Sequence, residues 1–312
     1  MAVRKLVDPK CDFAFKKVFG TKKNSDVLIA FLNDMLYFRN APPIVEVTLQ
    51  QTIFPAEIYT HKTVILDVLC KDADGHLYIV EMQAIDQEAF FTKRAEFYVS
   101  SAYYKQLDKG YEYQNLKEVY FIGVLNFTLF PPRVPMHSIH ATMEINVKER
   151  CMFGHTYVYL ELPKFKKGRN DLHKLTTNQE RWAYFFKYAE GMSDEEWEVF
   201  MQENEVFKKI YSSLDQASWS KSEMAYYDLY LKRVRDDLNK QKILLEQAEA
   251  KGEAKGEAKL AEAKAEGEAK LAEAKLEMVR NLLALGLDVD KISKVSGLSV
   301  AEIADLQKNK KI

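Results

Sequence analysis

The clearest pattern of apolar and polar positions is a pair of apolar segments around a short polar stretch. Residues 64–70 read VILDVLC, residues 77–82 read LYIVEM, and residues 71–75 between them read KDADG. Apolar runs of this length on either side of Asp-Gly are the strongest short-range signal for a β-hairpin. We therefore predict two paired strands joined by a tight turn.

Each predicted strand carries a carboxylate, Asp67 in the first and Glu81 in the second. A three-residue loop with Gly75 in the left-handed conformation places the two carboxylates opposite each other, and this is the loop we predict. A two-residue turn would instead set Asp67 opposite Met82. Buried carboxylates on neighbouring strands repel each other unless a cation lies between them. The hairpin is therefore a candidate metal site, and the alternative is a pair of core strands whose acids pair with Lys or Arg.

The segments around the hairpin predict an α/β fold, a mixed sheet with helices packed against it, because helices and strands follow one another along the chain. A first helix carries the apolar stripe of DFAFKKVFG, and Ser25 is the predicted N-cap of a second helix over residues 26–38. The apolar run at 119–127 is typical of a strand buried on both faces. Further helices are predicted over residues 87–107, 179–189 and 194–211, and further extended segments within 44–54, 138–147 and 156–162.

From about residue 222 the chain becomes one long helical pattern. Residues 256–266 and 267–277 form an eleven-residue repeat that differs at one position, and leucine recurs at that period. The stretch is either a solvated helical spacer or a coil through which the chain self-associates as a homo-oligomer. The sequence leaves both open.

The residues after 278 resemble a helix-turn-helix. Gly286 and Gly297 divide three short helices, and Ser299 and Glu302 form a capping box. The segment SVAEIADL, in the position of a recognition helix, has no Arg, Asn or Gln to read base edges. We therefore predict a packing or protein-interaction unit in preference to a DNA reader. The expected division is a first domain at residues 1–235, the helical repeat at 236–279 and the small unit at 280–312.

Charge and cysteine content narrow the class of protein. The formal net charge is −1, so nucleic acid would have to be contacted through local Lys and Arg patches. The 3 cysteines are widely spaced, which argues against a disulfide framework or a zinc ribbon and suits a reducing compartment. No apolar stretch reaches transmembrane length. We expect a cytoplasmic protein with no membrane association.

In the order of its motifs the chain resembles the recombination-promoting nuclease/putative transposase family of the PD-(D/E)xK nuclease superfamily. The resemblance covers roughly residues 8–235. The matching pieces are DFAFK with Phe19-Gly20, Asp67-Val68, Asp74-Gly75, Glu81-Met82-Gln83, Arg94 with Tyr98, VYFIGVLNF, ELPKF and the Trp182 helix. The resemblance implies a restriction-endonuclease-like mixed sheet flanked by helices, followed by a long C-terminal helix and a small helical unit.

The resemblance also implies the residues of the site. Asp67 and Glu81 become ligands of Mg²⁺, with Mn²⁺ as an alternative, and Gln83 stands where the superfamily has a catalytic lysine. Glutamine can orient a water molecule but cannot act as a cation or a general base, so the chemistry falls largely on the metal. Additional candidates are Asp12 as a further carboxylate, Arg94 as a phosphate contact and Tyr98 as a hydroxyl in the wall of the site.

The predicted function is that of a Mg²⁺-dependent DNA endonuclease, which hydrolyses phosphodiester bonds in recombination or mobile-element contexts. DNA would lie against basic side chains and be bound mainly through its phosphates. These side chains are Lys16, Lys17, Lys164, Lys166 and Lys167. The alternative is a catalytically silent nuclease-fold adaptor that acts through its C-terminal helices. Metal binding separates the two, since only the nuclease should gain stability with Mg²⁺ or Mn²⁺.

Overall fold

The structure is a computed structural model that divides into two compact units, residues 1–236 and 237–312. It describes residues 5–38, 41–54, 64–84, 90–107, 112–202, 204–236 and 288–308, with a few single positions between 239 and 279. The predicted eleven-residue repeat, and with it the question of a spacer or a self-associating coil, lies outside the described residues. None of the helices among the described residues is long and apolar enough to cross a membrane.

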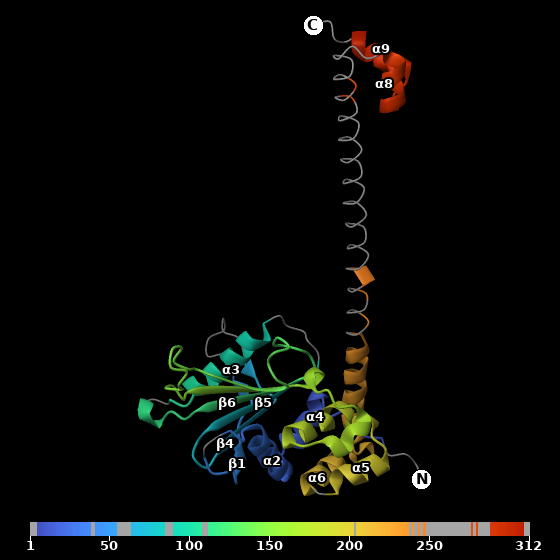
Figure 1. Ribbon diagram of the computed structural model, residues 1–312. Coiled ribbons are helices and arrows are strands. Elements are labelled where there is room, and N and C mark those ends of the chain that lie inside the picture. The colour runs from blue at the N-terminus through green and yellow to red at the C-terminus, as the bar shows by residue number, and fades with distance from the viewer. Residues whose placement is uncertain are drawn as a thin grey trace. The chain divides into compact units, whose positions relative to one another are not determined.

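A six-stranded mixed sheet organises the first unit (Figure 1). Its order is β1 (Val47–Leu49), β4 (Val68–Asp72), β5 (Leu77–Gln83), β6 (Val119–Leu125), β8 (His155–Glu161) and β7 (His137–Ala141). Strands β5, β6 and β8 run parallel, and the remaining neighbours are antiparallel. A separate two-stranded ribbon joins β2 (Ile53–Phe54) to β3 (Val64–Ile65). Because β5, β6 and β8 are parallel, their carboxyl ends lie along one edge of the sheet.

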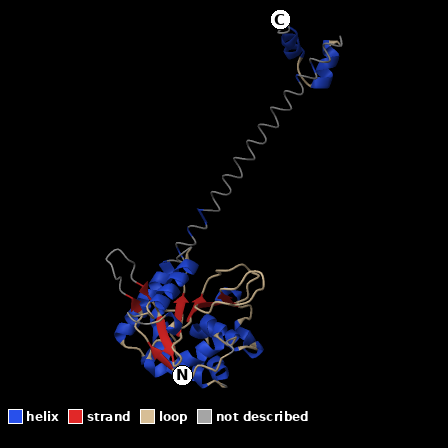
Figure 2. Ribbon diagram, turned by 90° about the vertical axis from the view of Figure 1, so that its left-hand side faces the viewer, coloured by secondary structure: helices blue, strands red, loops and turns tan. Residues whose placement is uncertain are grey.

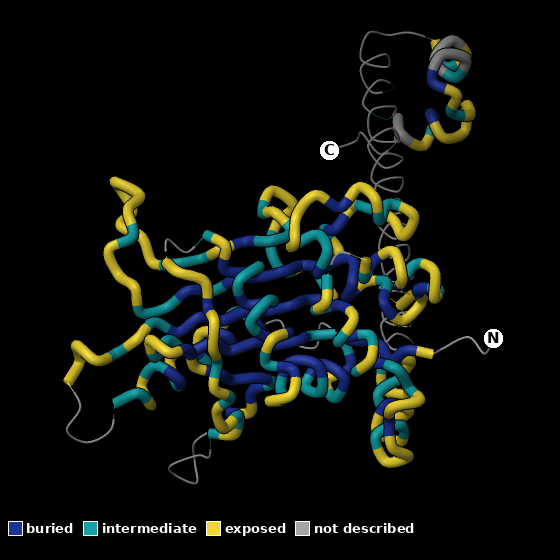
Figure 3. Tube along the Cα trace, turned by 90° about the horizontal axis from the view of Figure 1, so that it is seen from below, coloured by how far each residue is buried: buried dark blue, intermediate teal, exposed yellow. Residues whose placement is uncertain are grey.

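Helices cover both faces of this sheet (Figure 2). They are α1 (Asp12–Phe19), α2 (Ser25–Met35), α3 (Phe91–Tyr104), α4 (Asn178–Tyr188), α5 (Asp194–Met201) and α6 (Glu205–Leu214), and residues 221–236 are also helical. Short 3₁₀ turns span Lys22–Asn24, Tyr113–Asn115, Leu162–Lys164, Arg169–Lys174, Ala189–Gly191 and Gln216–Ser218. The sheet is therefore the buried middle layer of the unit, as Figure 3 shows for its central strands.

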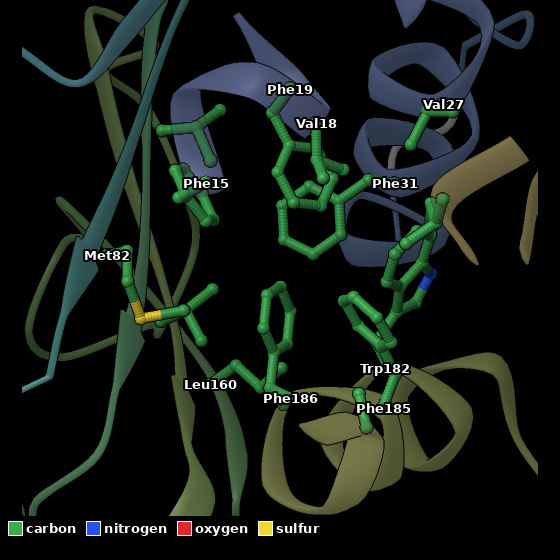
Figure 4. Packing of buried hydrophobic residues seen from close by; sticks show 14 of the residues in the cluster. Phe15, Val18, Phe19, Val27, Phe31, Met82, Leu160, Trp182, Phe185 and Phe186 are labelled. Carbon is green, nitrogen blue, oxygen red and sulfur yellow. The ribbon is translucent and has the colours of Figure 1, made fainter. Parts of the chain in front are cut away.

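The larger hydrophobic core lies between the sheet and helices α1, α2 and α4. Figure 4 shows the rings of Phe19, Phe31, Trp182 and Phe186 packed together, with Met82 of β5 on the strand side of the cluster. A smaller core fills the other face, where α3 covers β5 and β6. All three tryptophans are buried, so they serve as large apolar anchors of the core.

The observed elements confirm the predicted α/β class and correct several boundaries. The second helix begins at Ser25 itself, with Asn24 as its N-cap residue, and ends at Met35. The helix predicted from residue 87 begins at Phe91, and the strand predicted over 138–147 ends at Ala141. That strand stops early because the Glu144 carboxylate accepts the backbone N–H groups of the two residues after Ile145 and folds the chain into a turn.

The second unit contains α8 (Val289–Ser296) and α9 (Val300–Lys308). Gly297 ends α8 in the left-handed conformation, with a φ of 71°, which glycine adopts at little cost. Ser299 and Glu302 form the predicted capping box, each accepting the other's backbone N–H. Ile303 is buried here. The helical character of this unit therefore agrees with the sequence pattern.

Candidate active site

The hairpin of β4 and β5 has the predicted register. Val68 pairs with Val80 and Lys71 with Leu77, so the residue before β4, Asp67, stands opposite Glu81. The loop is the three-residue one, since the N–H of Asp72 bonds the carbonyl of His76 at 3.1 Å. Gly75 closes it with a φ of 93°, in the region that disfavours residues with a Cβ.

The carboxylates of Asp67 and Glu81 each accept a backbone N–H from the other strand of the hairpin. The Asp67 N–H donates to Glu81 Oε1 at 2.9 Å, and the Met82 N–H donates to Asp67 Oδ2 at 3.0 Å. Glu81 is only 4% exposed, and the side chain of Asp67 is 12% exposed. Two carboxylates are thus fixed side by side at the carboxyl end of β5, each with one oxygen used by a backbone N–H.

This arrangement is electrostatically costly without a cation. Burial raises the pKa of Glu81 well above its ordinary value, and the nearby charge of Asp67 raises that pKa further. The positive charges of Arg94 and Lys16 act in the opposite direction. The carboxyl pair therefore favours binding of positive charge at this end of the hairpin.

Helix α1 contributes two charged side chains to the pair. Lys16 Nζ lies 3.1 Å from Asp67 Oδ1, the oxygen that does not accept the Met82 N–H. Asp12 lies one turn earlier in α1, and its pKa is raised by burial and by the charge of Asp67. The sequence predicts that Lys16 contacts DNA, whereas in the structure its ammonium group pairs with the carboxylate of Asp67. The pattern of α1 predicts its buried stripe but gives no sign of this contact.

The remaining candidates come from β5 and α3. Gln83 follows Glu81 on the same face of β5, and its Nε2 donates to the Met82 carbonyl at 3.0 Å. Arg94 has its guanidinium 4.8 Å from the ring centre of Phe91, and its charge acts on Glu81. Tyr98 is half-buried against the smaller core, one turn further along α3. Arg94 therefore interacts electrostatically with the carboxyl pair, and Tyr98 lies one turn from Arg94 on the same helix.

Gly123 also lies in this region, although the sequence motifs did not predict a role for it. It pairs with Glu81 on one side and with Tyr159 on the other. A Cβ at this position would lie 3.1 Å from a ring carbon of Tyr159 and 3.1 Å from a ring carbon of Phe121. The glycine leaves room for these rings next to the carboxyl pair. Its only sequence signal was its place inside an otherwise apolar strand.

Most of the other lysines predicted to bind DNA have acidic partners in the fold. Lys17 Nζ lies 2.7 Å from a Glu223 carboxylate oxygen. Lys164 Nζ lies 2.6 Å from a carboxylate oxygen of Glu161, which is fully buried. Lys167 forms a third such pair, 2.5 Å from Glu180, and Lys166 is exposed. Lys17, Lys164 and Lys167 thus form ion pairs within the fold, and contact of all four lysines with DNA remains a prediction.

A second group of possible metal ligands lies at the opposite end of the hairpin. One ligand atom from each of Asp72, Asp74 and His76 falls within 4.8 Å of the others. The Asp72 carboxylate, however, already accepts the Tyr78 hydroxyl at 2.5 Å and the His76 N–H at 2.9 Å. These hydrogen bonds give Asp72 a structural role in closing the turn.

A mixed sheet flanked by helices, with an Asp and a Glu side by side on a hairpin, is the arrangement of PD-(D/E)XK nucleases, and Gln83 stands where their motif has lysine. Comparison with family models agrees: residues 9–243 match the PD-(D/E)XK nuclease family transposase model. The chain belongs to this family. Residues 272–308 match the C-terminal HTH domain of the Rpn/YhgA-like nuclease family. Searches of curated proteins and of solved structures found no match.

These matches confirm the resemblance that the motifs indicated and the restriction-endonuclease-like fold. They support a nuclease linked to mobile elements, and both family descriptions indicate DNA as the class of partner. The C-terminal match also confirms the resemblance to a helix-turn-helix. Our preference for a packing role of that unit over DNA binding stays a prediction.

Proposed function

We propose that this chain is a metal-dependent DNA endonuclease that hydrolyses phosphodiester bonds in DNA recombination or mobile-element movement. The observation that carries the proposal is the buried pair of Asp67 and Glu81, whose backbone hydrogen bonds fix two carboxylates side by side. Hydrolysis of a phosphodiester needs positive charge near the scissile phosphate and a positioned water molecule.

The carboxyl pair fits a hard divalent cation. Carboxylate oxygens are the ligands that Mg²⁺ and Mn²⁺ prefer, and the raised pKa of Glu81 reflects burial and the nearby Asp67 charge, which a cation would offset. In this proposal Asp67 and Glu81 hold the ion, and Asp12 is a further carboxylate, whose pKa is raised by burial and by the charge of Asp67. When bound, the ion would polarise the phosphate and lower the pKa of an attacking water molecule.

The other side chains of the site would bind the DNA phosphate and orient the attacking water. Gln83 stands on the Glu81 face of β5, where its amide would position the attacking water. Arg94 would contact a phosphate oxygen of DNA through its planar guanidinium, and Tyr98 would form part of the wall. The role of Arg94 rests on the effect of its charge on Glu81, that of Gln83 on its place two residues beyond Glu81 along β5, and that of Tyr98 on its place one turn from Arg94 in α3.

The test is nicking of supercoiled plasmid by the full chain with Mg²⁺, Mn²⁺, Ca²⁺ or EDTA. Asp67→Asn and Glu81→Gln are compared with Asp74→Asn, which changes an exposed carboxylate at the far end of the hairpin. We expect metal-dependent nicking that is lost in the first two variants and kept in the third. Melting temperatures with and without metal are measured in parallel, since an ion bound to the folded state raises the melting temperature.

Nicking that survives in both site variants would mean that the site is elsewhere. Loss of nicking in Asp74→Asn alone would move the metal to the turn. If no metal produces nicking or raises the melting temperature, the chain is better explained as an adaptor with a nuclease fold that acts through its C-terminal helices.

A further inference from the structure

The family description names a lysine two residues after an acidic residue, whereas this chain has Glu81-Met82-Gln83. A glutamine amide carries no charge. We infer that Lys16 of α1 supplies the positive charge that Gln83 cannot, and that it acts on the phosphate and water of the reaction. The inference rests on the proposed function and assigns a catalytic role to a residue from a different element.

The position of Lys16 carries this inference. Its ammonium lies 3.1 Å from Asp67 Oδ1, and its charge also acts on Glu81 and on Asp12. The side chain is 42% exposed, so its charged end faces both the buried carboxyl pair and the solvent from which DNA arrives. Lys16 thus borders the place where a phosphate would meet the two carboxylates.

The backbone that carries Lys16 is firmly placed. Its neighbours in α1, Phe15 and Phe19, are fully buried in the larger core beside Phe186. Packing of this kind fixes a helix relative to the sheet, so the lysine is presented to the hairpin by a rigid element. Pre-organised charge of this sort stabilises a transition state without a reorganisation cost.

Lys17, the next cation along α1, is committed to other contacts. Lys17 is paired with Glu223 and lies 4.5 Å from the ring centre of Trp219, so two adjacent lysines of α1 have different surroundings. Arg94 approaches Glu81 from α3, with its guanidinium over the Phe91 ring. Of the two adjacent lysines, Lys16 is the one that the structure places within ion-pair distance of a site carboxylate.

The role assigned to Lys16 uses its charge and leaves its protonation unchanged. In the hydrolysis, a water oxygen bonds to phosphorus, the bond from phosphorus to one sugar oxygen breaks, and that oxygen takes up a proton. The water proton goes to solvent. Negative charge grows on the phosphate oxygens during this step, and an ammonium with three donors stabilises that charge.

The test compares Lys16→Met, Gln83→Lys and the double variant Lys16→Met/Gln83→Lys with the unchanged chain. Lys209→Met is the matched control, because Lys209 also pairs with an aspartate, Asp26, at 2.6 Å but lies on α6. The readouts are the nicking rate with Mg²⁺ and the metal-induced rise in melting temperature, which reports ion binding without catalysis.

We expect Lys16→Met to slow nicking by about 100-fold, the usual effect of removing one stabilising donor from a transition state. Its metal-induced rise in melting temperature should be kept or enlarged, since a competing cation has been removed from Asp67. The double variant should recover at least about 10-fold of the lost rate, because a lysine at 83 restores the charge from β5. Lys209→Met should nick at the unchanged rate.

Three results would overturn the inference while leaving the nuclease in place. The first is a Lys16→Met nicking rate within about threefold of that of the unchanged chain, because one stabilising donor normally changes the rate far more. The second is loss of the metal-induced rise in melting temperature in Lys16→Met, and the third is no recovery of the rate in the double variant. Loss of the metal response would show that Lys16 only maintains the carboxyl pair. Absence of nicking by the unchanged chain would instead overturn the proposed function, and this inference with it.

Discussion

The backbone N–H of Asp67 donates to the Glu81 carboxylate, and the Asp67 carboxylate in turn accepts the N–H that follows Glu81, at 2.9 and 3.0 Å. The two acids are therefore structural partners as well as candidate ligands. An amide oxygen can replace the carboxylate oxygen in each of these hydrogen bonds. Asn and Gln substitutions consequently separate the loss of charge from the loss of the hairpin contact, which alanine would not do.

Glu81→Gln is expected to raise the melting temperature of the metal-free protein at neutral pH by a few degrees. Burial raises the pKa of Glu81 in the folded state, so the folded chain binds more protons than the unfolded chain above the ordinary glutamate pKa. The free energy of unfolding therefore falls as pH rises from the ordinary glutamate pKa to the raised pKa of Glu81. The neutral glutamine removes this decline.

The measurement is the melting temperature in EDTA from pH 4 to pH 8 for the unchanged chain and for Glu81→Gln. The two curves should diverge toward high pH, with the variant above. A variant that melts lower throughout would show that the charged carboxylate itself stabilises the hairpin. With Mg²⁺ present the order should reverse, because only the unchanged chain gains stability from the ion.

Tyr78→Phe is expected to lower the free energy of unfolding by about 1.5–3 kcal/mol, the range for a hydrogen bond to a charged group. Burial raises the pKa of Asp72, but the Tyr78 hydroxyl and His76 outweigh it and lower that pKa. This stabilisation is present above the ordinary aspartate pKa and is lost as pH falls through the lowered one. Urea unfolding should therefore show a larger difference at pH 7 than at pH 3. Asp74→Asn, at an exposed turn residue, should change the unfolding free energy by less than about 0.5 kcal/mol.

Lys164→Met tests whether this lysine serves the fold or DNA. Its partner Glu161 has no exposed surface and also accepts the N–H groups of Leu129 and Phe130. Removing the lysine leaves a buried carboxylate without its counter-charge, which costs about 3–5 kcal/mol. Exposed Lys166, changed to Met, should cost less than about 0.5 kcal/mol. Unaltered stability of Lys164→Met together with weaker, less salt-dependent DNA binding would favour the phosphate contact instead.

Gly123→Ala is expected to cost about 1–3 kcal/mol, because the added methyl group meets the rings of Phe121 and Tyr159 at 3.1 Å. Denaturant unfolding measures the cost. If stability is unchanged but the metal response weakens, the methyl group has been accommodated by displacing Glu81, its neighbour on β5.

Local sequence was sufficient for the hairpin and for the buried strand β6. The positive φ of Gly75 and the register of the hairpin depend on residues near one another in the chain, and both appear in the structure as predicted. The strand predicted through residue 147 failed because a side chain, Glu144, competed for the backbone N–H groups that a ladder would use. Such competition is not visible in the apolar pattern.

The sequence alone determined that Asp67 would stand opposite Glu81, since the strand period and the loop length fix the register of a hairpin. Only the tertiary structure decided which cations meet that pair. Lys16 and Lys17 are adjacent and chemically identical, yet the packing of α1 directs the first to Asp67 and the second to Glu223. Contacts between elements far apart in the sequence depend on how the helices pack on the sheet, and the local spacing of residues does not predict that packing.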